Sequence, residues 1–113
     1  MRYLLVICDD EIDNLSPEEI RLHPPMASWL AEMDGRGVRR GGVRLRLSSD
    51  ATTVRVRDGE LLRTDGPHAE TKEQMGGFDV IECEDLEEAI EIASKHPTAA
   101  KGSVEVRPVW GEV

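Results

Sequence analysis

The sequence predicts an α+β fold in which one antiparallel sheet carries its helices on a single face. Three observations indicate it: strand-like segments begin and end the chain, helix-start signals lie between them, and an Asp-Gly dipeptide marks a hairpin. The chain has 113 residues, of which 39% are hydrophobic and 33% charged, as is typical of a globular protein. We therefore expect a single domain over residues 1–113.

The first third of the chain predicts a strand followed by two helices. RYLLVIC (2–8) is apolar without alternation, which is typical of a central, covered strand. SPEE (16–19) has the residues of a capping box and predicts a helix start, whereas HPP (23–25) removes two backbone donors and predicts a break before a second helix. The core face of that second helix has helical spacing and comprises Met26, Trp29, Leu30 and Met33.

The rest of the chain predicts three more strand segments, a hairpin and a helix. In chain order they are the strand VRLRL (43–47), the hairpin TTVRVRDGELLRT (52–64), the strand GFDVIEC (77–83), the helix DLEEAIEIASKHP (85–97) and the strand SVEVRPVW (103–110). Two strand-helix-strand units in tandem predict a ferredoxin-like sheet with helices on one face and an inserted β-hairpin. Because the other face lacks cover, we expect a homodimer.

The two cysteines are predicted to be reduced thiols. Cys8 and Cys83 fit no zinc spacing, and we expect them at corresponding ends of neighbouring parallel strands. The longest apolar run (3–8) is far shorter than the roughly 20 residues of a membrane span, and no secretion signal is recognisable at the start. The sequence therefore predicts a cytoplasmic protein that does not bind membranes.

The net charge of −9 hides an asymmetry. From Arg36 to Arg63 there are eight arginines and three acids, a local balance of +5, so the remainder of the chain carries −14. An acidic chain with few aromatic residues lacks the usual features of a nucleic-acid-binding protein. The three histidines, at 23, 68 and 96, have no metal-ligand spacing, and no cofactor motif occurs. We expect neither a metal nor a cofactor.

The candidate catalytic residues lie in a polar loop, TDGPHAETKEQMGG (64–77). Asp65 and His68 stand three apart across a turn, so the carboxylate can hold the imidazole as a general base. Alternatively, Asp65 bonds its own loop backbone, and the segment around Lys72 is a solvated lid. Both interpretations stay open.

Arginines alternate with apolar residues on the strands that precede this loop. Arg44, Arg46, Arg55 and Arg57 are either the solvated face of edge strands or the mouth of a dimer cleft that attracts a small anionic ligand. The candidate ligand-binding residues are Arg44, Arg55 and Lys72.

Three segments resemble the YCII-related, DGPF-type domain family: ATTVRVRDG (51–59), TDGPHAETKEQMGGF (64–78) and GSVEVRP (102–108). The resemblance implies a ferredoxin-like fold that assembles as a homodimer of the dimeric α+β barrel type. It also implies a histidine and an aspartate held in a cleft, with His23 near the corresponding histidine, and an association with extracytoplasmic-function sigma factors. The phenylalanine of the DGPF motif is His68 here, so this residue either packs in its place or has acquired a role.

Two functions follow from these patterns. One is an acid–base enzyme of unknown substrate, in which Asp65 orients His68 or His23. The other is a non-catalytic ligand-binding or accessory module, which the association of the similar family with sigma factors suggests is linked to transcription.

Overall fold

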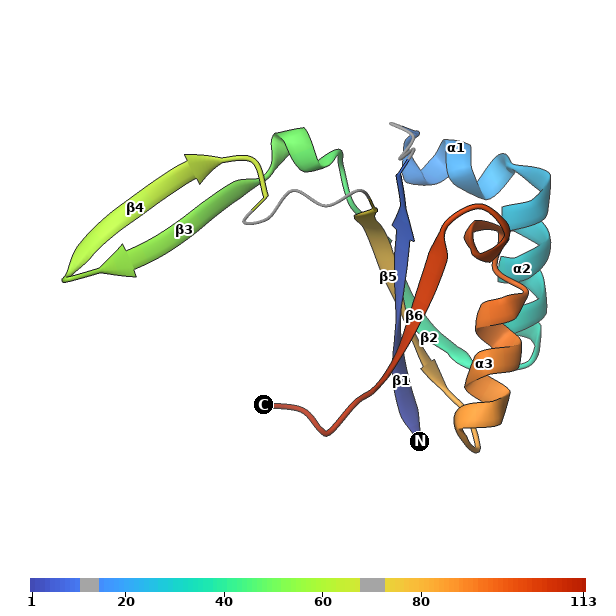
Figure 1. Ribbon diagram of the computed structural model, residues 1–113. Helices are drawn as coiled ribbons and strands as arrows, with labels where there is room; N and C mark the ends of the chain where they lie inside the picture. Colours follow the sequence, from blue (N-terminus) through green and yellow to red (C-terminus); the bar gives the residue numbers. More distant parts are fainter. Residues whose placement is uncertain (11–14, 68–72) are drawn as a thin grey trace.

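The computed structural model describes residues 1–10, 15–67 and 73–113 and has an α+β architecture (Figure 1). Its strands are β1 (Arg2–Asp9), β2 (Arg39–Arg44), β3 (Thr52–Arg57), β4 (Glu60–Asp65), β5 (Gln74–Glu82) and β6 (Ser103–Pro108). Its helices are α1 (Pro17–Leu22), α2 (Pro24–Gly35) and α3 (Leu86–Ser94), and two short 3-10 turns are η1 (Ser48–Asp50) and η2 (Pro97–Ala100).

The main sheet has four strands in the order β2-β5-β1-β6, and every neighbouring pair is antiparallel. All three helices lie on one side of this sheet, while β3 and β4 form a separate two-stranded sheet (Figure 1). The predicted ferredoxin-like sheet with helices on one face and an inserted hairpin is therefore confirmed. The hairpin turns at Asp58 and Gly59, whose φ angles of 52° and 78° suit a two-residue turn of the favoured type.

The prediction for the two cysteines was wrong in its geometry. β1 and β5 are antiparallel, with Arg2 opposite Glu82 and Cys8 opposite Met75, so Cys8 and Cys83 lie at opposite ends of the strand pair. The physical reason is the connection through β2. Both β1 and β2 are antiparallel to β5. The first strands of the two strand-helix-strand units, β1 and β5, therefore run in opposite directions. Both cysteines are unpaired thiols.

The second strand also begins earlier than its sequence predicts. We expected a strand over 43–47, but β2 starts at Arg39 and ends at Arg44, so it contains Gly41 and Gly42. Glycine is unfavourable in strands because it has no side chain to pack. Here pairing with β5 outweighs that propensity, and Gly42 faces Asp79, whose carboxylate occupies the space that a β-carbon at Gly42 would fill.

Local capping signals set the helix starts. The Ser16 hydroxyl accepts a hydrogen bond from the backbone N–H of Glu19, and the Glu19 carboxylate accepts one from the N–H of Ser16. The Asp85 carboxylate caps α3 by accepting from the N–H of Glu88. No helix among the described residues is long and apolar enough to cross a membrane.

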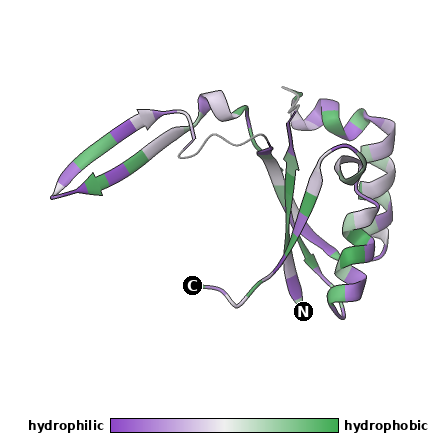
Figure 2. Cartoon of the chain, viewed as in Figure 1, coloured by the Kyte–Doolittle hydropathy of each residue, from purple (hydrophilic) through white to green (hydrophobic). Residues whose placement is uncertain are grey.

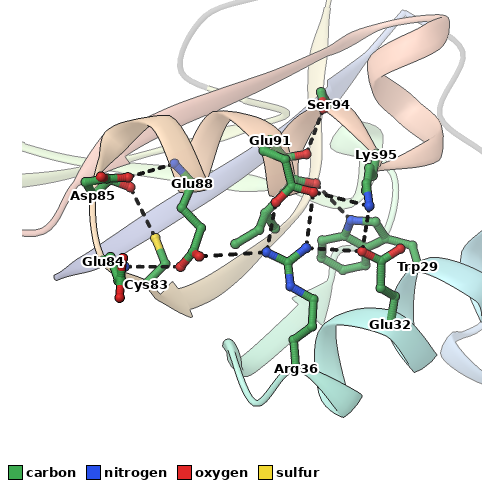
Figure 3. A network of polar contacts seen from close by, with 11 residues as sticks. Trp29, Glu32, Arg36, Cys83, Glu84, Asp85, Glu88, Glu91, Ser94 and Lys95 are labelled. Atoms are coloured by element: carbon green, nitrogen blue, oxygen red, sulfur yellow. Dashed lines mark hydrogen bonds and ion pairs between the residues drawn. The ribbon is translucent and has the colours of Figure 1, made fainter.

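The core lies between the sheet and the helices. Its fully buried side chains are Tyr3, Leu5, Met33, Ile81 and Ile92. The Trp29 Nε1–H donates a hydrogen bond of 3.1 Å to the Ile92 carbonyl oxygen and so joins α2 to α3. On the surface above it, Arg36 and Lys95 form ion pairs with glutamates of both helices (Figure 3). The buried contact therefore has a charged outer layer.

The opposite face of the sheet carries none of the described helices (Figure 1). Side chains alternate along a strand, so Leu4 on β1 and Phe78 and Val80 on β5 point away from the helices. All three are half-buried by their neighbours within the sheet. Hydrophobic residues run along much of β1 and parts of its neighbours in the sheet (Figure 2). We call this surface the open face.

Gly77 is predicted to be necessary for the pairing of β5 with β2. A β-carbon there would lie 2.5 Å from the Val43 carbonyl oxygen, which is backbone and cannot rotate away. We expect Gly77→Ala to lower the free energy of unfolding by about 1–3 kcal/mol, the usual range for overpacking. The measurement is urea denaturation followed by circular dichroism.

Gly35→Ala is the matched control. A β-carbon at Gly35, near the end of α2, would meet nothing within 4 Å. This variant should be unchanged or more stable by up to about 1 kcal/mol, because alanine restricts the unfolded chain. Equal stability of Gly77→Ala and wild type would contradict the close approach of the two strands.

Candidate functional site

A cavity of about 520 Å³ lies between the sheet and the layer of α1 and α2. This volume is within the roughly 300–1,000 Å³ typical of small-molecule sites. Its walls come from β1, β2 and β5 on one side and from α1, α2 and η2 on the other. The ionisable residues among those that line it are Asp9, Arg21, His23, Arg39, Arg44, Asp79, His96 and Lys101.

Asp79 is a buried carboxylate in the sheet wall. It lies opposite Leu5 of β1 and Gly42 of β2, and therefore faces the helices. The Arg39 Nε–H donates a hydrogen bond of 2.9 Å to Asp79 Oδ1. Burial raises the pKa of Asp79, while the hydrogen bond and charge of Arg39 act in the opposite direction. The pKa of Asp79 is therefore raised above its ordinary value, because the effect of burial exceeds that of Arg39.

Asp9 supplies a second buried carboxylate at the end of β1. Its side chain is only 9% exposed, and the Lys101 Nζ lies 3.0 Å from Asp9 Oδ2. Gly102 allows this approach, since a β-carbon there would collide with the Cys8 carbonyl oxygen. The two carboxylates thus come from adjacent strands, and each has a cation beside it.

His96 lies in the cavity wall at the start of η2 and is 4% exposed. Its Nδ1 accepts a hydrogen bond of 3.1 Å from the Thr98 N–H, so the neutral ring carries its proton on Nε2. The ring meets Trp29 edge-on, with centroids 4.8 Å apart. Burial lowers the pKa of His96 to about 4. The ring is therefore neutral at physiological pH, and its Nε2–H is available as a hydrogen-bond donor.

His23 occupies the junction of α1 and α2 in the helical wall. Pro24 disfavours helical backbone at the preceding residue, and His23 has extended angles of φ −68° and ψ 119°. Its N–H still donates to the Ile20 carbonyl oxygen and ends α1. The residue is exposed and lines the cavity, so its imidazole is accessible to solvent and ligand.

Arg44 is the other predicted site residue that lines the cavity. Its Nε–H donates a hydrogen bond of 2.7 Å to the Leu15 carbonyl oxygen, which connects β2 with the segment before α1. This hydrogen bond holds the Nε end of the Arg44 guanidinium group at the backbone of Leu15. Arg44 therefore contributes a positioned positive charge to the cavity.

The remaining predicted residues lie elsewhere or outside the described chain. Asp65 is the exposed last residue of β4, and Arg55 is half-buried on β3. Neither is among the described residues that line the cavity. His68 and Lys72 lie outside the described residues, so the pairing of Asp65 with His68 stays a prediction.

The sequence analysis did not single out several residues of the cavity, namely Asp9, Arg39, Asp79, His96 and Lys101. A weak signal existed, because Asp79 interrupts the apolar strand segment 77–83 at a core-facing position. A carboxylate there is rarely buried unless it is paired. Arg39 and Lys101 gave no such signal, since their contacts depend on long-range pairing.

The described lining has an excess of positive charge. Four basic side chains stand against two carboxylates, although the whole chain has a net charge of −9. No group of three or more His, Cys, Asp or Glu residues within 1–10, 15–67 and 73–113 is arranged to hold a metal ion. The cavity is therefore suited to an organic anion with an apolar body, whose apolar part would meet Trp29, Leu30 and Ile7.

Two sequence comparisons relate the chain to known proteins. A profile of the YCII-related domain matches residues 1–112. An uncharacterised protein, R00369 of Rhizobium meliloti (strain 1021), is 46% identical over 68 residues, which is 58% of this chain and 55% of that protein. The match thus spans about half the length of this curated relative.

One solved structure is similar over nearly the whole chain. It is 5-chloro-2-hydroxyhydroquinone dehydrochlorinase (TftG) from Burkholderia phenoliruptrix AC1100, in complex with 2,5-dihydroxybenzoquinone. The TM-score is 0.50 at 15% sequence identity, with 99% of this chain and 96% of that chain covered. At this identity the likeness supports the fold.

The buried His96 is predicted to make stability depend on pH. An unfolded histidine titrates near 6.5, whereas the pKa of His96 in the folded chain is about 4. As pH falls from about 6.5 to 4, the histidine becomes protonated in the unfolded chain but stays neutral in the folded chain. The free energy of unfolding therefore decreases. At about 1.36 kcal/mol per pKa unit, the loss is about 3 kcal/mol.

His96→Asn tests this assignment, because the asparagine oxygen can still accept from the Thr98 N–H. The variant lacks the titrating ring, so its urea midpoint should change less than that of wild type between pH 7 and 4. Parallel pH profiles for the two proteins would show that His96 does not cause the loss.

Proposed function

The chain belongs to the YCII-related domain family, and on this premise we propose that it binds a small organic anion in the cavity and performs acid–base chemistry there. The observation that supports the proposal is the convergence of His23, two buried carboxylates and a surplus of cations on one cavity. A buried carboxylate with a raised pKa in a concave site, as Asp79 is here, is typical of functional centres. The substrate is proposed only as a chemical class.

Anion binding would rely on charge and on one hydrogen-bond donor. Arg39 lies beside Asp79, Lys101 lies beside Asp9, and the Arg44 Nε–H donates to the Leu15 carbonyl oxygen, so all three cations are positioned at the cavity. The surplus positive charge acts in a partly enclosed site, where charge interactions are stronger than in open water. The Nε2–H of His96 would add a directional contact, because its Nδ1 is already used by Thr98.

The acid–base step is assigned to His23, with Asp79 as a second ionisable group on the other wall of the cavity. His23 comes from the helical wall and Asp79 from the sheet wall, so a ligand between them would have an imidazole on one side and a carboxylate on the other. Imidazole is the side chain best suited to move protons near neutral pH. His96 does not share this role, since burial holds its pKa at about 4.

A second candidate is a ligand-binding module without catalysis. The observation that favours it is the pairing of each buried carboxylate with a cation, Asp79 with Arg39 and Asp9 with Lys101. Ion pairs of this kind also occur as structural elements. Such a module would bind the same anion without exchanging a proton at His23.

The probe for this site is 2,5-dihydroxybenzoquinone, the molecule bound by the structural neighbour, which is small, planar and acidic. We expect calorimetry to detect its binding, and Arg44→Gln to weaken it at least tenfold, while Arg44→Lys keeps most of the affinity. Arg57→Gln, a change of the same type on β3 and outside the cavity lining, is the control and should bind like wild type. Equal affinity of Arg44→Gln and wild type would overturn the site.

Proton linkage separates the two functions. Titrations in buffers of different ionisation enthalpy should show proton uptake on binding in wild type, because the anion stabilises the imidazolium, and none in His23→Gln. Binding without uptake in wild type would favour the non-catalytic module.

We further propose that the protein is a homodimer assembled through the open face. The support is the apolar character of Leu4, Phe78 and Val80, which lie on the side of the sheet that carries none of the described helices (Figure 1). The cytoplasm is the proposed location, because both cysteines are unpaired thiols, a state that a reducing compartment preserves. Light scattering at micromolar concentration should give twice 12.6 kDa. A monomer at that concentration would contradict the dimer.

A further inference from the structure

The β3–β4 hairpin, which we call the arm, extends away from the rest of the molecule (Figure 1). Residues directly opposite each other in a strand pair share a face. In this register Val54, Val56 and Leu61 lie on the same face of the arm, which we call its apolar face. Their side chains are 59%, 59% and 65% exposed. The arm therefore presents a row of uncovered β-branched and aliphatic side chains.

Two hydrogen bonds close the base of the arm within the described residues. The Gly66 N–H donates over 2.7 Å to the Ala51 carbonyl oxygen, and the Thr53 hydroxyl donates over 2.8 Å to the Gly66 carbonyl oxygen. Along β4 every residue is exposed. An isolated two-stranded hairpin is at best marginally stable in water. A partner that covers the apolar face would stabilise it.

The chain exposes more surface than a compact monomer of its mass, and a partner could cover the excess. The chain exposes 7854 Å², whereas a compact monomer of this mass exposes about 6,200 Å². Its radius of gyration is 15.7 Å, compared with about 13 Å for a compact domain of this length. The excess surface is more than the roughly 800 Å² that each partner contributes to a standard interface. The excess exposed surface is thus large enough to form one side of a standard dimer interface.

The direction of the arm indicates what the partner is. The arm projects on the side of the sheet opposite the helices, which is the side of the open face (Figure 1). A second copy bound at the open face would therefore lie alongside the arm. Between Thr52 and Asp65 the arm has three arginines and three acids, so its net charge is zero and its apolar face can be buried against a second copy without net charge repulsion.

We propose that the arm is an inter-subunit clamp whose apolar face packs against a second copy of this chain. The inference rests on the proposed homodimer and adds a separate contact to it: the open face provides one part of the interface and the arm of each subunit the other. Because a two-fold dimer repeats every contact, each subunit would both give and receive an arm.

The test compares lysine substitutions on the two faces of the arm. Val56→Lys/Leu61→Lys places charges on the apolar face, and Thr64→Lys places one on the opposite face, where Thr64 pairs with Thr53. We expect analytical ultracentrifugation to show a dimer dissociation constant raised at least tenfold for the first variant and less than threefold for the second. Val56→Thr, which keeps the branched shape, should weaken the dimer by a smaller factor.

Hydrogen exchange gives an independent readout on the unmodified protein. Backbone amides of β3 and β4 should exchange more slowly as protein concentration rises through the dissociation constant. Near-ultraviolet circular dichroism of the buried Trp29 environment should be unchanged in both lysine variants, because the arm lies outside the core.

The outcomes separate the clamp from the dimer. A wild-type dimer whose dissociation constant is unchanged by Val56→Lys/Leu61→Lys would overturn the clamp and leave the open-face dimer in place. A monomeric wild type would overturn both, and the arm would then have to bind a different protein or a lipid surface. If the double variant fails to fold, an unchanged dissociation constant for Val56→Thr together with concentration-independent exchange overturns the clamp.

Discussion

The antiparallel pairing of β1 with β5 is the interaction on which the rest of the structure depends. It places Leu5 opposite Asp79 and so brings a carboxylate to the helix side of the sheet. The same register carries β1 to Asp9 at the edge of the cavity, beside Lys101. It also turns Leu4 and Val80 to the open face. A shift of one residue would exchange the two faces, which would remove both the site and the proposed dimer surface.

The helical layer is held to this sheet by buried contacts rather than by its surface charges. Trp29 is 3% exposed, hydrogen-bonds the backbone of α3 and meets the His96 ring. The Arg36 ion pairs connect the same two helices in solvent (Figure 3), where such pairs contribute at most about 1 kcal/mol each. Trp29 and His96 both line the cavity, so core packing and site geometry share residues.

The charged lining of the cavity lowers the stability of the fold compared with an apolar interior of the same volume. Buried ion pairs such as Arg39 with Asp79 are often no more stable than apolar residues of similar volume, because desolvation opposes the attraction. Gly42, the strand glycine beside Asp79, adds a weak strand position to the same place. The buried ion pair and the strand glycine lie at the same cavity. Charged groups that are already desolvated and positioned interact more strongly with a ligand, which is an advantage in a binding site.

The sequence by itself determined the elements that depend on near neighbours. The caps at Ser16 and Asp85 and the turn at Asp58 act over three or four residues, so the helix starts and the hairpin were predicted correctly. The order of these elements then predicted the ferredoxin-like sheet with its inserted hairpin. Among the candidate residues, Arg44 was named from the alternation of arginines along its strand and His23 from the family resemblance, and both line the cavity.

Only the tertiary structure decided the register, the start of β2 and the composition of the cavity. Gly41 and Gly42 have low strand propensity and belong to β2 only because β5 pairs with them. The antiparallel direction of β1 and β5 places Cys8 and Cys83 at opposite ends of the strand pair. The physical reason is that these features depend on contacts between distant segments: Arg39 and Asp79 are 40 positions apart, and Asp9 and Lys101 are 92 positions apart. No pattern of neighbouring residues specifies which distant side chain will complete a buried charge pair. That choice is made when the sheet assembles and the helices close over it.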